Sequence, residues 1–170
     1  MENNQAILEE LYDEFLKNLV QFHVIMIDTC SLMESGCSIL LEKMIPFLKQ
    51  YKKKVVIPGR VIDELKRHYN SGEVKKHIAA QNGLKMCRKL QNEGCVNFPG
   101  DESDNFADNT FCVRFQMLKG QYHLVLITQD RNLSYDILQL NDSQINKGKP
   151  IEVYKVLKNG YLRNAKKQIE

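Results

Sequence analysis

Two uninterrupted apolar runs constrain the fold of this chain more than any other feature. Residues 23–28 (HVIMID) and 122–128 (YHLVLIT) each hold four consecutive apolar residues, without the alternation of a half-exposed strand. Strands of this kind are covered on both faces, as in parallel sheets. Shorter strand-like segments at 55–58, 94–98 and 151–156 alternate with helical segments. This order predicts an α/β fold: a three-layer α/β/α sandwich around a central, mainly parallel sheet.

The periodicity of the remaining segments predicts helices at about 4–20, 38–51, 60–69, 73–92, 101–118 and 132–140. Pro46 predicts a kink or a restart in the second of these. Residues 1–21 form an N-terminal amphipathic helix, 22–158 the α/β domain, and 159–170 a polar tail, either a short helix or a frayed end. The inner face of the first helix packs on the domain or on a partner, including a second copy, through Ile7, Leu8, Leu11, Phe15 and Leu19.

Composition indicates a globular chain in a reducing compartment. The 170 residues are 43% hydrophobic, enough for one full core, and the net charge of +3 is only mildly basic. The polar, acidic start does not resemble a signal peptide, and no apolar stretch is long enough to span a membrane. We therefore expect a cytoplasmic protein with no membrane partner, whose cysteines are reduced thiols that act mainly as small packing residues. The cations at 52–54 and 66–89 are either RNA contacts or solvated surface.

The cysteines and histidines do not form a recognisable zinc or catalytic motif. Five cysteines include no CxxC pair, and the four histidines show no HxxxH spacing: His23, His68, His77 and His123. A structural zinc site and a histidine general base are therefore not expected. The chain also lacks the glycine-rich patterns of nucleotide-binding loops.

Acidic residues lie where an α/β fold would gather them. Asp28 and Asp130 follow the two apolar runs, and ligand sites in open α/β sheets lie outside the carboxyl ends of the strands. Glu64 and Asp108 stand near the starts of helices. Two carboxylates about 4 Å apart repel by about 4 kcal/mol at an effective dielectric constant near 20, a cost that a divalent cation removes. The pattern indicates a metal-dependent phosphodiester enzyme using Mg²⁺ or Mn²⁺, which prefer oxygen ligands.

Taken in order, the motifs around these acids resemble the PIN-domain family of metal-dependent nucleases. The match covers about residues 22–157. It comprises a strand followed by Asp28-Thr29-Cys30-Ser31-Leu32, a strand ending in Ile57-Pro58, a helix with Val61, Glu64 and Leu65, the pair Asp108-Asn109, and a strand followed by Thr128, Asp130, Arg131 and Leu133.

The resemblance implies an endoribonuclease that hydrolyses mainly single-stranded RNA and leaves 5′-phosphate and 3′-hydroxyl ends. Asp28, Glu64, Asp108 and Asp130 would be the catalytic metal ligands. Thr128 would act indirectly, orienting Asp130 or a water. Asp104, one helical turn before Asp108, is a further candidate ligand or a residue that favours the helix start. Asp28 has an alternative role as a helix cap. The alternative functions are a DNA or structure-specific nuclease and a non-catalytic RNA- or protein-binding module.

Overall fold

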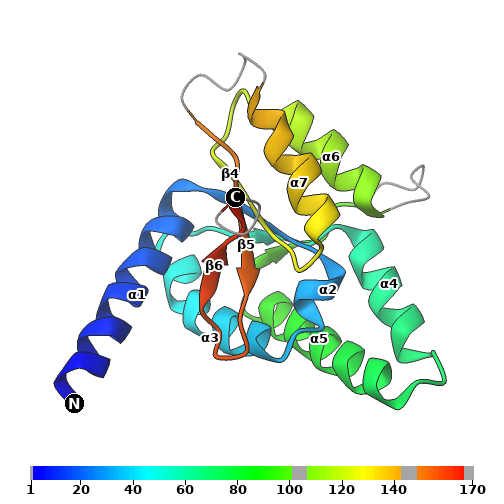
Figure 1. The fold of residues 1–170 in the computed structure, drawn as a ribbon. Helices are drawn as coiled ribbons and strands as arrows, with labels where there is room; N and C mark the ends of the chain where they lie inside the picture. Colours follow the sequence, from blue (N-terminus) through cyan, green and yellow to red (C-terminus); the bar gives the residue numbers. More distant parts are fainter. Residues whose placement is uncertain (1, 101–106, 143–148, 167–170) are drawn as a thin grey trace.

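The fold is built on one six-stranded sheet with helices on both faces. The computed structural model describes residues 2–100, 107–142 and 149–166 (Figure 1). The strands have the order β3-β2-β1-β4-β5-β6. Their bounds are β1 Val24–Ile27, β2 Val55–Val56, β3 Val96–Asn97, β4 Leu124–Ile127, β5 Glu152–Val156 and β6 Leu162–Asn164. The first five are mutually parallel, and β6 is antiparallel to β5. The predicted α/β class with a mainly parallel sheet is confirmed.

The helices separate into groups around the sheet. α3 packs against both α1 and α5, whereas α6 lies beside α7, which contacts β5 (Figure 1). The arrangement is consistent with a three-layer α/β/α sandwich. The helices are α1 Glu2–Phe22, α2 Thr29–Leu32, α3 Ser35–Gln50, α4 Gly59–Tyr69, α5 Val74–Asn92, α6 Ala107–Leu118 and α7 Arg131–Gln139, with a 3₁₀ turn (η1) at Leu140–Asp142.

The two apolar runs are neighbours at the centre of the core. β1 and β4 pair in register from Val24 with Leu124 to Ile27 with Ile127. All four β4 side chains are fully buried, as are those of Ile25, Met26 and Ile27 within a few per cent. Each large apolar side chain buried in this way contributes about 1.5–3 kcal/mol. The register of β1 and β4 also aligns the residues that follow and precede these strands.

The prediction of a short helix or a frayed end in the polar tail was wrong for Leu162–Asn164, which forms the edge strand β6, whereas residues 167–170 lie outside the described residues. Gly160 has φ +83°, a conformation that favours glycine and allows the chain to reverse after β5. An edge strand with partly exposed side chains lacks the continuous apolar pattern that reveals a central strand.

The inner face predicted for the N-terminal helix was only partly correct. Ile7, Leu8 and Leu11 are exposed, whereas Leu19 is buried and Phe15 is half-buried. The buried face of α1 instead consists of Tyr12, Leu16, Leu19 and Val20. The second half of the helix therefore packs within the chain.

Pro46 does not make α3 restart. The helix continues through it for 16 residues. Pro46 is exposed, so the carbonyl that loses its N–H partner one turn earlier can bind water instead.

Within the described residues, no helix combines the length and the apolar character needed to cross a bilayer.

Candidate functional site

The sheet topology creates a natural ligand site between β1 and β4. After β1 the chain builds β2 and β3 on one side, and then returns to build β4 on the other side. The connections that leave β1 and β4 therefore diverge, and in open α/β sheets ligands commonly bind outside the carboxyl ends of the strands at such a point. Asp28 is the first residue after β1, and Asp130 follows shortly after β4. We call this side of the sheet the carboxyl edge.

Asp28 is a buried carboxylate, with 4% of its surface exposed. Its Oδ1 accepts a hydrogen bond of 2.9 Å from the Ser31 N–H and so caps α2. Its Oδ2 accepts bonds from the Thr128 hydroxyl and, at 3.0 Å, from the Cys30 thiol. Burial raises the pKa of Asp28, and these hydrogen bonds oppose the rise. A cation near Asp28 would favour the charged form.

Thr128 links Asp28 to Asp130. Its buried hydroxyl donates to Asp28 and accepts a 3.0 Å hydrogen bond from the Asp130 N–H. Asp130 is itself the N-cap of α7, and its Oδ1 accepts from the N–H groups of Asn132 at 2.8 Å and Leu133 at 3.0 Å. Both cap bonds use one carboxylate oxygen. The second oxygen makes no hydrogen bond with the described residues and is available for a ligand.

Glu64 reaches the same edge from α4. Its Oε2 accepts a 2.5 Å hydrogen bond from the hydroxyl of Thr29, the residue that follows Asp28. Val61 and Leu65 are fully buried and hold this face of α4 against the core, so Glu64 points inward and is half-buried. The neighbouring Asp63 is exposed.

The remaining expected ligands are only partly described. Asp108 lies in the first turn of α6, but its side chain is outside the described part of the structure, and Asp104 is outside it altogether. Among the described residues, the carboxylates of Asp28, Glu64 and Asp130 do not form a group with ligand atoms within 4.8 Å of one another. The three acids share an edge, but they are not gathered tightly enough to form one compact set of ligands.

Cys30 is not the packing residue that the sequence predicted, because it is exposed. Its sulfur nevertheless points to Asp28. Burial of the sulfur and the Asp28 charge raise the pKa of the thiol to about 12. A thiol that stays protonated at neutral pH is a poor nucleophile. By contrast, Cys37, Cys87 and Cys95 are buried free thiols.

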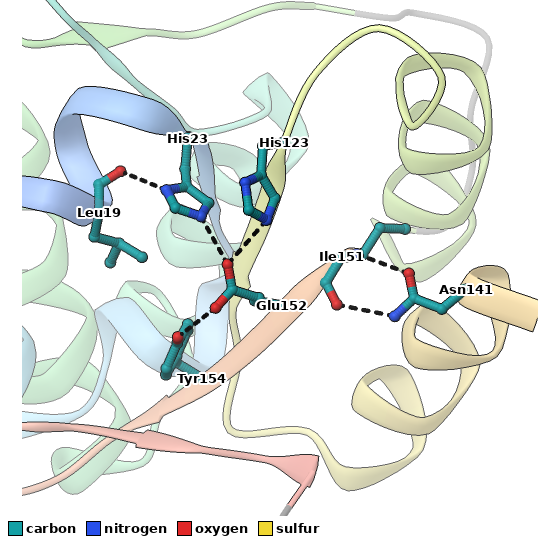
Figure 2. A network of polar contacts seen from close by, with 7 residues as sticks. All are labelled: Leu19, His23, His123, Asn141, Ile151, Glu152 and Tyr154. Carbon is teal, nitrogen blue, oxygen red and sulfur yellow. Dashed lines mark hydrogen bonds and ion pairs between the residues drawn. The ribbon is translucent and has the colours of Figure 1, made fainter. Parts of the chain in front are cut away.

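The described residues contain one compact set of metal-ligand side chains, and the sequence motifs did not reveal it. His23, His123 and Glu152 meet at the opposite, amino edge of the sheet (Figure 2). Each histidine directly precedes one of the two buried strands, and this shared position was the available sequence signal. Sequence spacing alone hides the set, since its members are up to 129 residues apart.

Comparisons with known proteins add no family assignment. No family model matches the chain, and no curated protein matches it. The similarity to PIN domains is therefore a hypothesis that depends on the ordered motif residues.

Proposed function

We propose that this chain is a metal-dependent endoribonuclease of the PIN type, acting on single-stranded RNA at the carboxyl edge. The main support is the hydroxyl of Thr128, which links Asp28 and Asp130 at the point where the connections from β1 and β4 diverge. Glu64 is tied to the same edge through Thr29. The chain has no long insertion between its motifs to clamp a branched DNA, which favours RNA over a structure-specific DNA substrate.

The donor atoms at this edge fit Mg²⁺ or Mn²⁺. Asp28, Glu64 and Asp130 offer carboxylate oxygens, the ligands that hard cations prefer, and Asp108 belongs to the proposed set. Mg²⁺ keeps several of its waters and needs only one or two direct carboxylate ligands, so it does not require all these acids in one compact set. When bound, the ion would acidify water and neutralise charge on the phosphate.

The protein's own contribution is to orient these groups before substrate arrives. Three donors hold the Asp28 carboxylate in one position. The cap bonds hold Oδ1 of Asp130 and leave its other oxygen toward the ligand. Arg131, exposed at the start of α7 and next to Asp130, would contact a phosphate in this proposal. Preorganised charges of this kind supply much of the rate enhancement in phosphodiester hydrolysis.

The alternative is a non-catalytic RNA- or protein-binding module. One observation favours it: Asp28 and Asp130 both cap helices, a role that accounts for them without a metal. The two functions can be separated because asparagine caps a helix about as well as aspartate but carries no charge.

The test is cleavage of labelled single-stranded RNA in Mn²⁺, Mg²⁺ or EDTA. For a nuclease, Asp28→Asn, Glu64→Gln, Asp108→Asn and Asp130→Asn should each lower the rate on the order of a hundredfold while leaving the fold intact. Asp63→Asn is the matched control and should retain full activity, because Asp63 is the exposed neighbour of Glu64. Asp104→Asn should have a smaller effect than Asp108→Asn if Asp104 is only a helper.

Three results would contradict the proposal. Full metal-dependent activity in Asp28→Asn would show that this residue is only a cap. RNA binding without cleavage in either metal would favour the binding module. Cleavage of DNA but not of RNA, with the same dependence on the acids, would assign the site to a DNA nuclease.

A further inference from the structure

A second cluster of ligand side chains lies at the amino edge, away from the proposed nuclease site. His23 is the residue before β1, His123 is the residue before β4, and Glu152 is the first residue of β5. These three strands are adjacent and parallel, and Val24 pairs with Leu124. The central sheet therefore fixes the relative positions of the three side chains (Figure 2).

Both imidazoles direct the same ring nitrogen at one carboxylate oxygen. The Nε2 atom of His23 lies 2.7 Å from Oε2 of Glu152, and the Nε2 atom of His123 lies 3.1 Å from it. The two rings have centroids 3.9 Å apart and are inclined at 39°. All three ligand atoms lie within 4.8 Å of one another.

The hydrogen bonds of His23 define which nitrogen can bind a metal. Its Nδ1 is 3.0 Å from the carbonyl oxygen of Leu19. A carbonyl only accepts, so Nδ1 carries a proton. Nε2 then either donates to Oε2 of Glu152 from the doubly protonated ring or, in the neutral ring, directs a lone pair at the same position. The buried Nε2 of His123 forms no hydrogen bond with the described residues. Lone pairs that converge on a carboxylate repel one another unless a proton or a cation lies between them.

The surrounding contacts are those that support metal ligands. A histidine ligand usually donates its other N–H to a backbone carbonyl or a carboxylate, as His23 does to Leu19. The Tyr154 hydroxyl donates a 2.8 Å hydrogen bond to Oε1 of Glu152 and so leaves Oε2 for the site.

We propose that His23, His123 and Glu152 bind one divalent transition-metal ion of the zinc class, through the two Nε2 atoms and Oε2. Two imidazoles and one carboxylate are a zinc-type ligand set, unlike the all-oxygen set at the carboxyl edge. Zinc–ligand bonds of about 2.0–2.2 Å in a tetrahedron place ligand atoms about 3.3 Å apart. From the observed 3.1 Å and 2.7 Å, Oε2 would therefore move about 0.2 Å from the nitrogen of His123 and about 0.6 Å from that of His23. Three protein ligands would leave the fourth position of the tetrahedron for a water.

Such an ion would connect His23, just after α1, to His123, just before β4, and to Glu152, the first residue of β5. Its function would then be to fasten three segments that are distant in the sequence. Because the ion binds only the folded chain, it would raise the melting temperature. This function does not depend on the nuclease proposal.

The test is calorimetric titration of the EDTA-treated, desalted full-length protein with Zn²⁺, together with thermal melts. The wild type should bind one Zn²⁺ per chain with micromolar or tighter affinity, and should melt at a higher temperature with Zn²⁺. His123→Ala and Glu152→Gln should each weaken binding more than about tenfold, since even loss of an outer partner costs 10–100-fold. Tyr154→Phe should weaken it less.

Three controls separate this site from other ligands in the chain. His68→Ala, Cys30→Ser and Asp63→Asn should retain wild-type Zn²⁺ affinity, because these residues lie outside the cluster. Co²⁺ provides a second readout: its visible spectrum should change on binding to the wild type and to the three controls, but not to His123→Ala. Glu152→Gln keeps the size of the side chain and remains informative if His123→Ala does not fold, which circular dichroism will show.

Zn²⁺ binding that is unchanged in both His123→Ala and Glu152→Gln would overturn the proposal. So would a wild type that binds Zn²⁺ only at millimolar concentration, or one that loses its Zn²⁺ site in Cys30→Ser. RNA cleavage is not a readout here, so failure of the zinc site and failure of the nuclease proposal are distinguishable.

Discussion

At the scale of single residues, Thr128 illustrates how one buried hydroxyl can serve two acidic residues. The hydroxyl donates to the Asp28 side chain, just after β1, and accepts from the Asp130 backbone, at the start of α7. It therefore fixes the positions of both residues. Valine has nearly the same shape as threonine but lacks both hydrogen-bonding functions. Replacing Thr128 therefore tests the polar link with little change in packing.

We predict that Thr128→Val lowers RNA cleavage about tenfold or more, equal to a loss of about 1.4 kcal/mol. It should also destabilise the fold by about 1–3 kcal/mol, because buried polar groups lose their partner. Thr128→Ser keeps a hydroxyl and should recover most of both losses. Single-turnover rates and urea denaturation are the measurements, and a valine variant with wild-type rate and stability would show that the link is dispensable.

Individual residues also show how far the sequence could predict the candidate site. Asp28 and Asp130 could be placed at one edge because each follows an apolar run that can only be a buried strand. The contact between Thr29 and Glu64 could not be foreseen, since it depends on how α4 packs. The meeting of His23 with Glu152 depends on the order of strands in the sheet, which local patterns do not contain.

At the scale of elements, the start of α3 fits closely against the turn between β5 and β6. A β-carbon added at Gly36 would lie 1.7 Å from the carbonyl oxygen of Leu157, in the backbone of that turn. Only glycine allows this approach. β6 was missed from the sequence for a related reason: α3 holds the turn before it, and Tyr12 of α1 bonds to its first residue, Leu162.

We predict that Gly36→Ala destabilises the protein by about 1–3 kcal/mol or more, since the added methyl group overlaps main-chain atoms that cannot rotate away. The matched control is Gly72→Ala, where an added β-carbon has no neighbour within 4 Å. The control should be neutral or stabilise by about 0.4–1 kcal/mol through the unfolded state. The midpoints of urea denaturation of the two variants measure this difference. Equal stability of Gly36→Ala and Gly72→Ala would contradict the close contact between Gly36 and Leu157.

Tyr12 connects α1 to the same turn. Its hydroxyl donates a 2.8 Å hydrogen bond to the Gly160 carbonyl and accepts a 3.0 Å bond from the Leu162 N–H, and its ring stacks on Tyr161 with centroids 4.2 Å apart. The apolar periodicity of α1 placed the inner face on Leu11 and missed this residue because tyrosine carries a polar group.

We predict that Tyr12→Phe costs about 1–3 kcal/mol, because it leaves two backbone groups without their partner. Tyr135→Phe, on the exposed face of α7, should change stability by less than about 0.5 kcal/mol. Both can be measured by thermal or urea denaturation. If Tyr12→Phe proves as harmless as the control, α1 is held by apolar contacts alone.

At the scale of the whole molecule, the sheet separates two chemistries. The acids lie at the carboxyl edge and the histidine cluster at the amino edge. Some cationic side chains lie at the amino edge and others at or near the carboxyl edge. Lys52, Lys53 and Lys54 directly precede β2 and so belong to the amino edge. Arg131 follows Asp130 at the carboxyl edge, and Lys75 lines a pocket with Leu32, at the end of the helix that Asp28 caps.

RNA affinity should therefore depend on Arg131 and Lys75 and not on the lysine run. For single-stranded RNA, each lost phosphate contact reduces the slope of log affinity against log salt by about 0.7. The double variant Lys75→Gln/Arg131→Gln should lower the slope by about 1.4, whereas the triple substitution of Lys52–Lys54 by glutamine should leave it unchanged. Fluorescence anisotropy with labelled RNA in Ca²⁺ or EDTA measures this, and the reverse result would move the RNA path to the opposite edge.

The position of β1 also has a consequence for how the chain folds. β1 lies between β2, which follows closely in sequence, and β4, which begins 100 residues later at Leu124. A chain that has emerged from the ribosome only as far as β3 can form the half-sheet β3-β2-β1, but one side of β1 then has no neighbour. That side is an open edge of four apolar residues, the type of edge that pairs with other chains. Synthesis of β4 closes it. The pairing of β1 with β4 completes the core, and its two strands are far apart in the sequence, so folding should be slow for a protein of this size. The chain should be most prone to aggregation before β4 is made.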